Sequence, residues 1–227
     1  MDTLAVIGVT EQVLSAYPET LLNDMERQRA DAFKFEVDRC DFVAAHLLVR
    51  ACGGEILDCP PDKLNVAQLC PTCAGPHGPP RLVEAPELAV SLAHTRGYVA
   101  ACAGPGPVGV DVERLDGRRF SVLFDVLAEA EARWVRASAD ARRAFLELWV
   151  RKEALIKAGY ATLDALPAVD LVGDMGEVAS RWREMWLTGF DDGVMVGACA
   201  SAEPVRVRVG GDGSVVRHQD HTVLGGQ

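Results

Sequence analysis

A stretch of the chain recurs after a constant interval, and this repeat constrains the fold more than any other feature. Residues 97–103 read Gly-Tyr-Val-Ala-Ala-Cys-Ala, and residues 194–200 read Val-Met-Val-Gly-Ala-Cys-Ala. A Pro-Val-x-Val segment follows each copy, and the two cysteines and the two prolines are both 97 residues apart. Small apolar residues can match by chance, but the constant interval favours a duplication. We therefore expect an α+β fold of two similar α/β halves related by a pseudo-twofold axis, each a small, mainly antiparallel sheet packed with helices.

Hydrophobic spacing and turn residues predict the elements of each half. Helical stretches are predicted at residues 21–50, 121–137 and 139–158, and strands at residues 88–92, 98–103, 108–113, 185–189, 194–200 and 205–209. Gly53-Gly54 is expected to end the first helix, and residues 59–80 to form a loop. The Gly-Pro-Gly-Pro segment at residues 104–107 is the expected junction. The predicted parts are an N-terminal half, residues 1–105, a C-terminal half, residues 106–210, and a flexible tail, residues 211–227.

The composition is typical of a soluble globular protein. Of the 227 residues, 49% are hydrophobic and 25% are charged. No apolar run reaches the ~20 residues that cross a bilayer. The first six residues carry no basic group, so a secretory signal is not expected and the predicted location is the cytoplasm. A net charge of −10 argues against a nucleic-acid partner, because such binding depends on neutralising phosphates.

An acidic strand is predicted where residues 109–114 read Gly-Val-Asp-Val-Glu-Arg. Alternate residues of a strand share a face, so Asp111 and Glu113 point one way while the valines between them anchor the strand in a core. Gly109 is expected to keep the acidic face open to a group that approaches the backbone. Two adjacent carboxylates repel unless a cation lies between them, and oxygen ligands suit Mg²⁺. The alternative is an exposed edge strand with solvated acids.

A second motif lies on the predicted helix at residues 139–158. Trp149, Glu153 and Lys157 follow each other at intervals of four, so they form one stripe. Glu153 can complete a metal site or act as a general base, and Lys157 suits a phosphate oxygen. Only four of the 23 basic residues are lysines, yet Lys152 and Lys157 lie within six residues, which hints at a need for a compact ammonium. The alternative is a surface helix with an ordinary Glu–Lys pair.

Together these motifs resemble a known family. The pattern G-[IV]-D-[IV]-E, followed about 35 residues later by W-x-x-K-E-x-x-x-K, resembles the two signatures of the Sfp-type 4'-phosphopantetheinyl transferase superfamily. Residues 91–94, Ser-Leu-Ala-His, resemble its S/N-x-S/T-H motif, and residues 39–42, Arg-Cys-Asp-Phe, its R-x-E-F stretch. The resemblance covers residues 21–209.

The resemblance implies an enzyme that transfers the 4'-phosphopantetheine moiety of coenzyme A to a serine of an apo acyl or peptidyl carrier protein, releasing 3',5'-ADP. It implies that Asp111, Glu113 and Glu153 hold Mg²⁺, with Asp111, Glu153 and Lys157 as the catalytic residues. Glu153 would take the serine proton, and Lys157 would stabilise the phosphate. The residues expected to bind coenzyme A are Arg39, His46, Arg81, His94, Thr95, Lys152 and Lys157. The N-terminal half would then bind the coenzyme, and the C-terminal half would carry the metal and catalytic motifs.

Some positions depart from the family's pattern or match it less firmly. Ala93 stands where the family has Ser or Thr, Pro79 where it often has Lys, and His46 where relatives often have Arg. These departures affect the expected affinity for coenzyme A rather than the type of reaction. Glu131 matches a further acidic position of the family.

The resemblance also implies partners. The expected partners are carrier proteins of polyketide, nonribosomal peptide or fatty-acid pathways, including antibiotic biosynthesis, and the two-halved length suggests a monomer. No nucleic acid or membrane partner is expected. Two other classes of function stay open: another magnesium-dependent phosphodiester enzyme, such as a nuclease, and a zinc-stabilised interaction module.

The interaction module depends on four residues of zinc-ligand type: Cys59, Cys70, Cys73 and His77. One C-x-x-C with one histidine is a weak zinc signal, because structural zinc sites have four closely spaced ligands. The sequence favours a loop of reduced thiols without metal.

Overall fold

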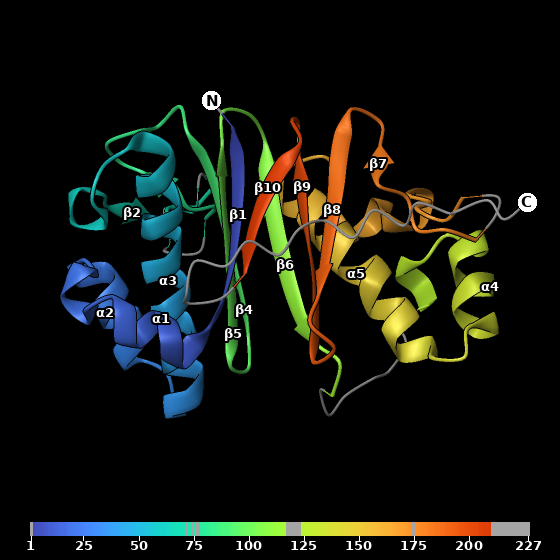
Figure 1. Ribbon diagram of the computed structural model, residues 1–227, viewed down its shortest axis with the longest axis horizontal. Helices are drawn as coiled ribbons and strands as arrows, with labels where there is room; N and C mark the ends of the chain where they lie inside the picture. Colours follow the sequence, from blue (N-terminus) through green and yellow to red (C-terminus); the bar gives the residue numbers. More distant parts are fainter. Residues whose placement is uncertain are drawn as a thin grey trace, which may run out of the picture.

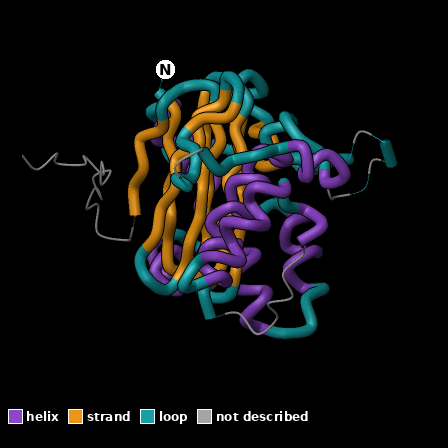
Figure 2. The backbone as a smooth tube through the Cα atoms, turned by 90° about the vertical axis from the view of Figure 1, so that its right-hand side faces the viewer, coloured by secondary structure: helices purple, strands orange, loops and turns teal. Residues whose placement is uncertain are grey.

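Two β-sheets lie side by side in the centre of the molecule, and helices cover their outer faces (Figure 1). The computed structural model describes residues 2–70, 72–73, 75, 78–116, 124–173 and 176–209. The first sheet has the strand order β10-β1-β5-β4-β3-β2, and the second has the order β6-β9-β8-β7. Viewed from the side, the strands run alongside one another and helices pack against them (Figure 2). The predicted α+β class is therefore confirmed.

The bounds of the elements are as follows. The strands are β1 Thr3–Val9, β2 Val66–Ala67, β3 Arg81–Leu82, β4 Ala89–Thr95, β5 Tyr98–Gly104, β6 Val108–Arg114, β7 Arg181–Trp182, β8 Met185–Asp191, β9 Met195–Ser201 and β10 Val205–Val209. The α-helices are α1 Thr10–Ala16, α2 Asp24–Asp31, α3 Glu36–Leu57, α4 Glu129–Ala137 and α5 Ala141–Lys157. The 3-10 helices are η1 Glu19–Leu21, η2 Pro61–Lys63, η3 Phe124–Val126 and η4 Leu163–Ala168.

Three apolar cores hold these layers together. One lies between α3 and the first sheet, and another between α4, α5 and the second sheet. The third lies between the two sheets and contains Ala100 and Cys102 of β5 with Val110 and Cys199 of the second sheet. Small and β-branched side chains predominate there, which lets the sheets approach closely. No helix within the described residues is long and apolar enough to cross a membrane.

The sequence repeat corresponds to a repeated hairpin. Strands β4 and β5 pair in the register Ser91↔Cys102, and β8 and β9 pair in the register Thr188↔Cys199, so the 97-residue interval maps one hairpin onto the other. The two sheets differ in their number of strands, and β10 pairs in parallel with β1 of the first sheet. The pseudo-twofold axis and the division at residues 105 and 106 stay predictions, because a strand from the second half completes the first sheet.

The prediction that Gly53-Gly54 ends the first helix is wrong, because α3 continues to Leu57. A Cβ at Gly53 would lie 2.6 Å from Leu82 Cδ1, and one at Gly54 would lie 2.5 Å from the carbonyl oxygen of Cys59. Each glycine therefore lets a neighbouring segment pack directly on the helix. This tertiary packing outweighs the low helix propensity of glycine.

Other helical boundaries also differ from the prediction. The stretch at residues 21–50 is broken after Asp31, and α2 begins at a capping box of Asn23 and Glu26. The stretch at residues 121–137 contains η3 and then α4, while residues 121–123 lie outside the described part. The strand β1 and helix α1 were not predicted. The tail beyond Val209 lies outside the described residues.

Candidate active site

Helix α5 lies directly on strand β6 at Gly109. A Cβ on Gly109 would lie 2.0 Å from the carbonyl oxygen of Ala154 and 2.7 Å from the backbone nitrogen of Ala158. The expectation that Gly109 stays open for a ligand is therefore wrong, since the group that approaches the backbone is α5. This contact brings the last turn of α5, with Lys157, next to Asp111.

Lys157 joins the helix to the free edge of β6. Its Nζ donates hydrogen bonds to Asp111 Oδ1 at 2.8 Å and to the carbonyl oxygen of Val110 at 2.9 Å. The backbone N–H of Val110 donates to Ser91 Oγ of β4 at 3.2 Å. Both backbone polar groups of Val110 are therefore satisfied by side chains, one from the first sheet and one from α5. This arrangement fixes the position of the acidic strand.

Asp111 is buried, and only one of its two oxygens has a partner. The Oδ1 atom accepts from Lys157, whereas Oδ2 is buried without a hydrogen-bond partner. Burial raises the pKa of the Asp111 carboxyl, and the charge of Lys157 opposes this shift. A buried carboxylate oxygen without a partner is costly, and a bound cation would remove that cost.

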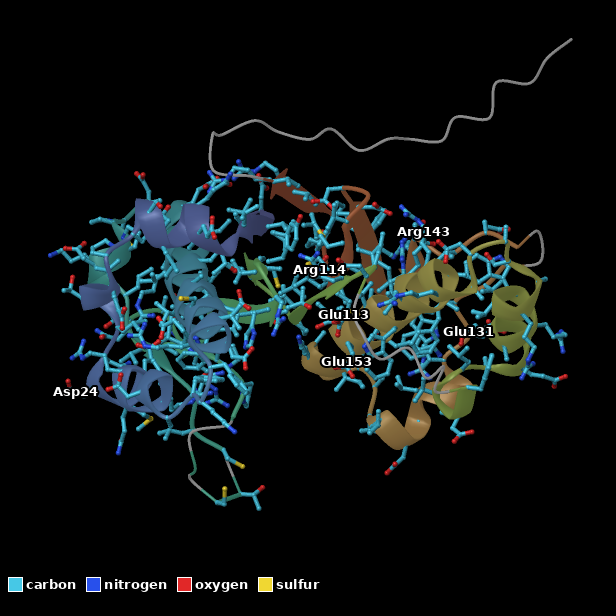
Figure 3. The ribbon with its side chains drawn as sticks, turned by 90° about the horizontal axis from the view of Figure 1, so that it is seen from below. Asp24, Glu113, Arg114, Glu131, Arg143 and Glu153 are labelled. Carbon is cyan, nitrogen blue, oxygen red and sulfur yellow. The ribbon has the colours of Figure 1, made fainter. Side chains whose placement is uncertain are left out.

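Glu113 and Glu153 extend the acidic site. Burial is the main reason why the pKa of Glu113 is raised to about 7, and the negative charges of Asp111 and Glu153 add to it. Burial and Asp111 also raise the pKa of Glu153, while Lys157 opposes this. Thr95 Oγ1 donates to Glu113 Oε2 at 3.5 Å. Figure 3 shows Glu113 and Glu153 in the region where β6 meets α5, with Glu131 apart from them.

The acidic site has the chemistry of a Mg²⁺ site but not yet its geometry. Three mutually repelling carboxylates and an unpartnered buried oxygen suit a hard cation that prefers oxygen ligands. Among the described residues, however, no group of three or more His, Cys, Asp or Glu side chains is placed to hold a metal. Lys157 supplies the positive charge and occupies Asp111 Oδ1. The residues fit the ion, and the side chains must converge to bind it.

The expectation that Lys152 lies beside the coenzyme needs correction. Lys152 is fully buried, and its Nζ lies 2.8 Å from Glu131 Oε2 and 2.8 Å from the carbonyl oxygen of Leu166. It also donates to the carbonyl oxygen of Val169. Although Lys152 precedes Glu153 in the sequence, consecutive helical residues point in directions ~100° apart. Lys152 therefore faces the core, while Glu153 faces β6.

Glu131, the further acidic position of the resemblance, is the buried partner of Lys152. Its carboxylate also accepts the backbone N–H groups of Ala128 at 2.8 Å and Leu171 at 3.0 Å. It therefore joins the start of α4 to the segment after η4, and it does not contribute to the acidic site.

The candidate coenzyme residues of the first half lie in different environments. His94 is exposed on β4, and Thr95 contacts Glu113. The pKa of His94 is lowered, mainly by the protein atoms that surround the ring. Arg39 forms an ion pair with Glu19. Arg81 is exposed on β3.

The expectation that His46 is available to the coenzyme also needs correction. The ring is buried, with Nδ1 2.8 Å from the carbonyl oxygen of Phe42 and Nε2 3.0 Å from Gln68 Oε1. Its centroid lies 4.0 Å from that of the Phe42 ring. Burial lowers the pKa of His46, so the neutral form is favoured. The side chain joins α3 to the end of β2.

Comparison with known proteins shows which family the part of the chain around the acidic site resembles. Residues 107–182 match the model of the 4'-phosphopantetheinyl transferase superfamily, and this range begins just before β6 and includes all of α5. The matched residues, which are less than half of the chain, are similar to this superfamily. The matched range contains Asp111, Glu113, Glu153 and Lys157.

One curated protein with a similar sequence is the "L-aminoadipate-semialdehyde dehydrogenase-phosphopantetheinyl transferase" of Schizosaccharomyces pombe. It is 24% identical to this chain over 155 residues, which is 60% of this chain and 58% of the relative. The match therefore spans less than two thirds of the relative's length.

Two residues that position the site were not among the predicted site residues. Ser91 accepts from Val110, as described above, and Asp41 of α3 accepts from Thr10 Oγ1 and from the backbone N–H of Gly97 at 3.0 Å. Asp41 thereby fixes the β4–β5 turn that follows His94. A sequence signal for Asp41 existed, since a charged residue among the apolar residues of a predicted helix often has a specific partner.

Proposed function

We propose that this chain transfers the 4'-phosphopantetheine moiety of coenzyme A to a serine of an apo carrier protein and releases 3',5'-ADP. The match of residues 107–182 to the model of the 4'-phosphopantetheinyl transferase superfamily supports this proposal. The observation that carries it is the pairing of Lys157 with Asp111 at the junction of β6 and α5, beside an unpartnered carboxylate oxygen. A Mg²⁺ ion bound by the carboxylates and the ammonium group of Lys157 would together offer positive charge at one place, which suits a pyrophosphate substrate.

The reaction forms one bond and breaks another. The serine oxygen attacks the phosphorus that carries the pantetheine arm, an Oγ–P bond forms, and the bond from that phosphorus to the leaving 3',5'-ADP oxygen breaks. In our proposal the serine proton passes to Glu153. A carboxylate with a raised pKa is a stronger base, and burial together with Asp111 raises the pKa of Glu153.

The remaining groups would stabilise charge. Lys157, which holds Asp111 in this structure, would turn part of its hydrogen-bonding capacity to a phosphate oxygen. Asp111, Glu113 and Glu153 would hold Mg²⁺, which when bound would neutralise charge on the pyrophosphate. Glu113, with its raised pKa, would bind the ion in its ionised form, so ion binding and loss of the Glu113 proton would be coupled.

The first half would bind the coenzyme. His94 and Thr95 are the best-placed candidates, because Thr95 already contacts Glu113 of the acidic site. Arg39 and Arg81 are further candidates with partly or fully exposed side chains. In this proposal residues 1–105 bind coenzyme A, and residues 106–210 carry the metal and catalytic groups. The chain would act as a monomer on carriers of polyketide, nonribosomal peptide or fatty-acid pathways.

The test combines product analysis with one variant. The purified chain is incubated with coenzyme A, Mg²⁺ and a panel of apo carriers, and both the intact carrier mass and 3',5'-ADP are measured. We expect one phosphopantetheine on the carrier serine for each 3',5'-ADP released. We expect Glu153→Gln to bind coenzyme A while transfer is nearly abolished.

Two outcomes would reject the proposal. Release of 3',5'-ADP without a gain of carrier mass would indicate hydrolysis by a magnesium-dependent phosphodiester enzyme instead. Transfer by Glu153→Gln at a rate near that of the unmodified chain would show that Glu153 is not the base.

A further inference from the structure

Asp41 of α3 is a buried acid that the acidic site does not use. The described part of the chain buries four carboxylates, those of Glu26, Asp41, Asp111 and Glu131. Three of them form ion pairs with a Lys or Arg side chain, whereas among the described residues no ion pair joins Asp41 to a cation. A buried charge without a cationic partner is costly, so its presence calls for a reason. The neighbours of Asp41 indicate that reason.

The hydrogen bonds of Asp41 join three segments of the first half. Its Oδ1 atom accepts from Thr10 Oγ1 at 2.5 Å and from the backbone N–H of Gly97 at 3.0 Å. The backbone N–H of Thr10 in turn donates to the carbonyl oxygen of Gly97 at 3.0 Å. Both backbone polar groups of Gly97 are therefore bound, one by α3 and the other by the first residue of α1. The turn between β4 and β5 is held from two sides.

This turn carries two of the candidate coenzyme residues. The last pairs of the hairpin are His94↔Val99 and Thr95↔Tyr98, so only Arg96 and Gly97 close it. Gly97 has a φ of 81°, which glycine adopts without strain. Because two residues alone close the hairpin, any shift of the turn moves the adjoining side chains with it. The hold on Gly97 therefore sets the positions of His94 and Thr95.

His94 lies on the side of the sheet that α3 covers. Val90 of β4 belongs to the core between α3 and the first sheet, and Leu92 packs against that core (Figure 1). Alternate residues of a strand share a face, so His94 faces the same side. Asp41 approaches the hairpin from this side too, because it lies on α3 and binds Gly97. The carboxylate and the imidazole ring therefore share one side of the β4–β5 hairpin.

The charges around His94 agree with this arrangement. Burial lowers the pKa of the His94 ring, and four charged side chains act on it as well. Asp41 and Asp38 of α3 raise the pKa, whereas Lys157 of α5 and Arg29 of α2 lower it. Asp41 has the largest effect of the four. A carboxylate at this position therefore favours the cationic ring, which a neutral amide in the same place would not do.

We propose that Asp41 is a positioning residue for coenzyme A, which holds the β4–β5 turn through Gly97 and favours a cationic His94 ring for pairing with an anionic group of the coenzyme. This inference rests on the proposed function, in which His94 is a candidate coenzyme residue. Asp41 acts through Gly97 and His94 and not by contact with the coenzyme. The two roles explain why an acid is buried here, since hydrogen bonds to a carboxylate are stronger than those to an amide, and only the carboxylate carries the charge.

Asp41→Asn separates the charge of this residue from its hydrogen bonds, because an amide oxygen can still accept from Thr10 and Gly97. The pKa of His94 is measured by NMR of the full chain with labelled histidines and without substrate, and His94→Gln assigns its signal. We expect a lower pKa of His94 in Asp41→Asn than in the unmodified chain. The control is Asp31→Asn, which removes an exposed acid at the end of α2 and should leave this pKa nearly unchanged. The same His94 pKa in Asp41→Asn and the unmodified chain would overturn the proposal.

Binding and transfer are then measured separately. We expect Asp41→Asn to bind coenzyme A at least ~5-fold more weakly at neutral pH, and its affinity to fall at a lower pH than that of the unmodified chain. The transfer rate at saturating coenzyme A should stay within ~2-fold, because Asp41 acts on binding and not on the chemical step. Thr10→Val removes the hydroxyl donor and should also weaken binding, whereas Thr10→Ser keeps the donor and should bind like the unmodified chain.

The outcomes distinguish this inference from the proposed function. Equal affinity of Asp41→Asn and the unmodified chain for coenzyme A would overturn the inference and leave the proposed function intact. If Asp41→Asn does not fold, the Thr10 variants decide, since equal binding by Thr10→Val and Thr10→Ser would overturn the hold on the turn. An unmodified chain that does not bind coenzyme A would reject the proposed function and the positioning role together.

Discussion

Lys157 Nζ lies 2.8 Å from Asp111 Oδ1, so the ammonium group of α5 and the carboxylate of β6 form an ion pair. The other oxygen of Asp111 is buried without a partner. This pair is the core of the proposed site. It links the two motifs through residues that are 46 positions apart in the sequence.

The first prediction concerns the shape of the Lys157 ammonium. Its Nζ fits between Asp111 Oδ1 and the carbonyl oxygen of Val110. A guanidinium is a wide planar fork, so Lys157→Arg should lose transfer although the charge remains. In Lys157→Ala the transfer rate should fall ~100-fold or more, because the positive charge that stabilises the transition state is removed. Transfer rates at saturating coenzyme A measure both effects. If Lys157→Arg transferred at the rate of the unmodified chain, the charge of residue 157 alone would be required and the prediction about its shape would be wrong.

The second prediction is a pH effect on stability in the absence of metal. Because the pKa of Glu113 is about 7 in the folded chain and lower in the unfolded chain, the folded state holds more protons between these two values. Stability should therefore fall as pH rises through this range, and Glu113→Gln should remove that part of the fall. Melting temperatures of both proteins from pH 4 to 8 measure it. Identical profiles for the two proteins would contradict the assignment.

The third prediction concerns the close contact at Gly109. Gly109→Ala places a Cβ against the backbone of α5, at Ala154 and Ala158, so the helix must shift. We expect a loss of ~1–3 kcal/mol in the free energy of unfolding, and a loss of transfer. The matched control is Gly106→Ala, whose Cβ would lie 3.3 Å from Ala202 Cβ and meet no backbone. Equal stability of Gly109→Ala and the control would show that α5 is not fixed at this point.

The motif elements could be predicted from the sequence, because their patterns are local. The strand predicted at residues 108–113 is β6 Val108–Arg114, and the strand at residues 205–209 has the predicted bounds. The stripe of Glu153 and Lys157 lies on α5 as expected. Alternation and helical spacing are properties of short segments, so the surrounding fold does not change them.

The partners of side chains and strands could not be predicted. Lys152 looked like a coenzyme ligand because it adjoins Glu153, yet its orientation depends on η4 and Glu131, which contact it from elsewhere in the chain. His46 was also predicted to bind the coenzyme, but its hydrogen-bond partner Gln68 is brought beside it only by the fold. The parallel pairing of β1 with β10 joins opposite ends of the chain, and no local pattern indicates it.

The fourth prediction separates a structural role of Lys152 from a coenzyme-binding role. Removing one partner of a buried ion pair leaves the other charge uncompensated, so Lys152→Met should reduce the free energy of unfolding by about 3–5 kcal/mol. The double variant Lys152→Met/Glu131→Leu should recover part of that loss. Denaturant unfolding measures both. A Lys152→Met variant of normal stability but weak coenzyme A binding would restore the role suggested by the sequence.

The dependence of transfer on Mg²⁺ tests the central claim most directly. The transfer rate is measured against Mg²⁺ concentration for the unmodified chain, Asp111→Asn and the control Asp116→Asn, an exposed acid just beyond β6. We predict that Mg²⁺ activates the unmodified chain and the control to saturation. Asp111→Asn should be slower by ~100-fold or more at the same concentrations while keeping its fold. Near-normal turnover of Asp111→Asn, or transfer that does not depend on Mg²⁺, would contradict the account.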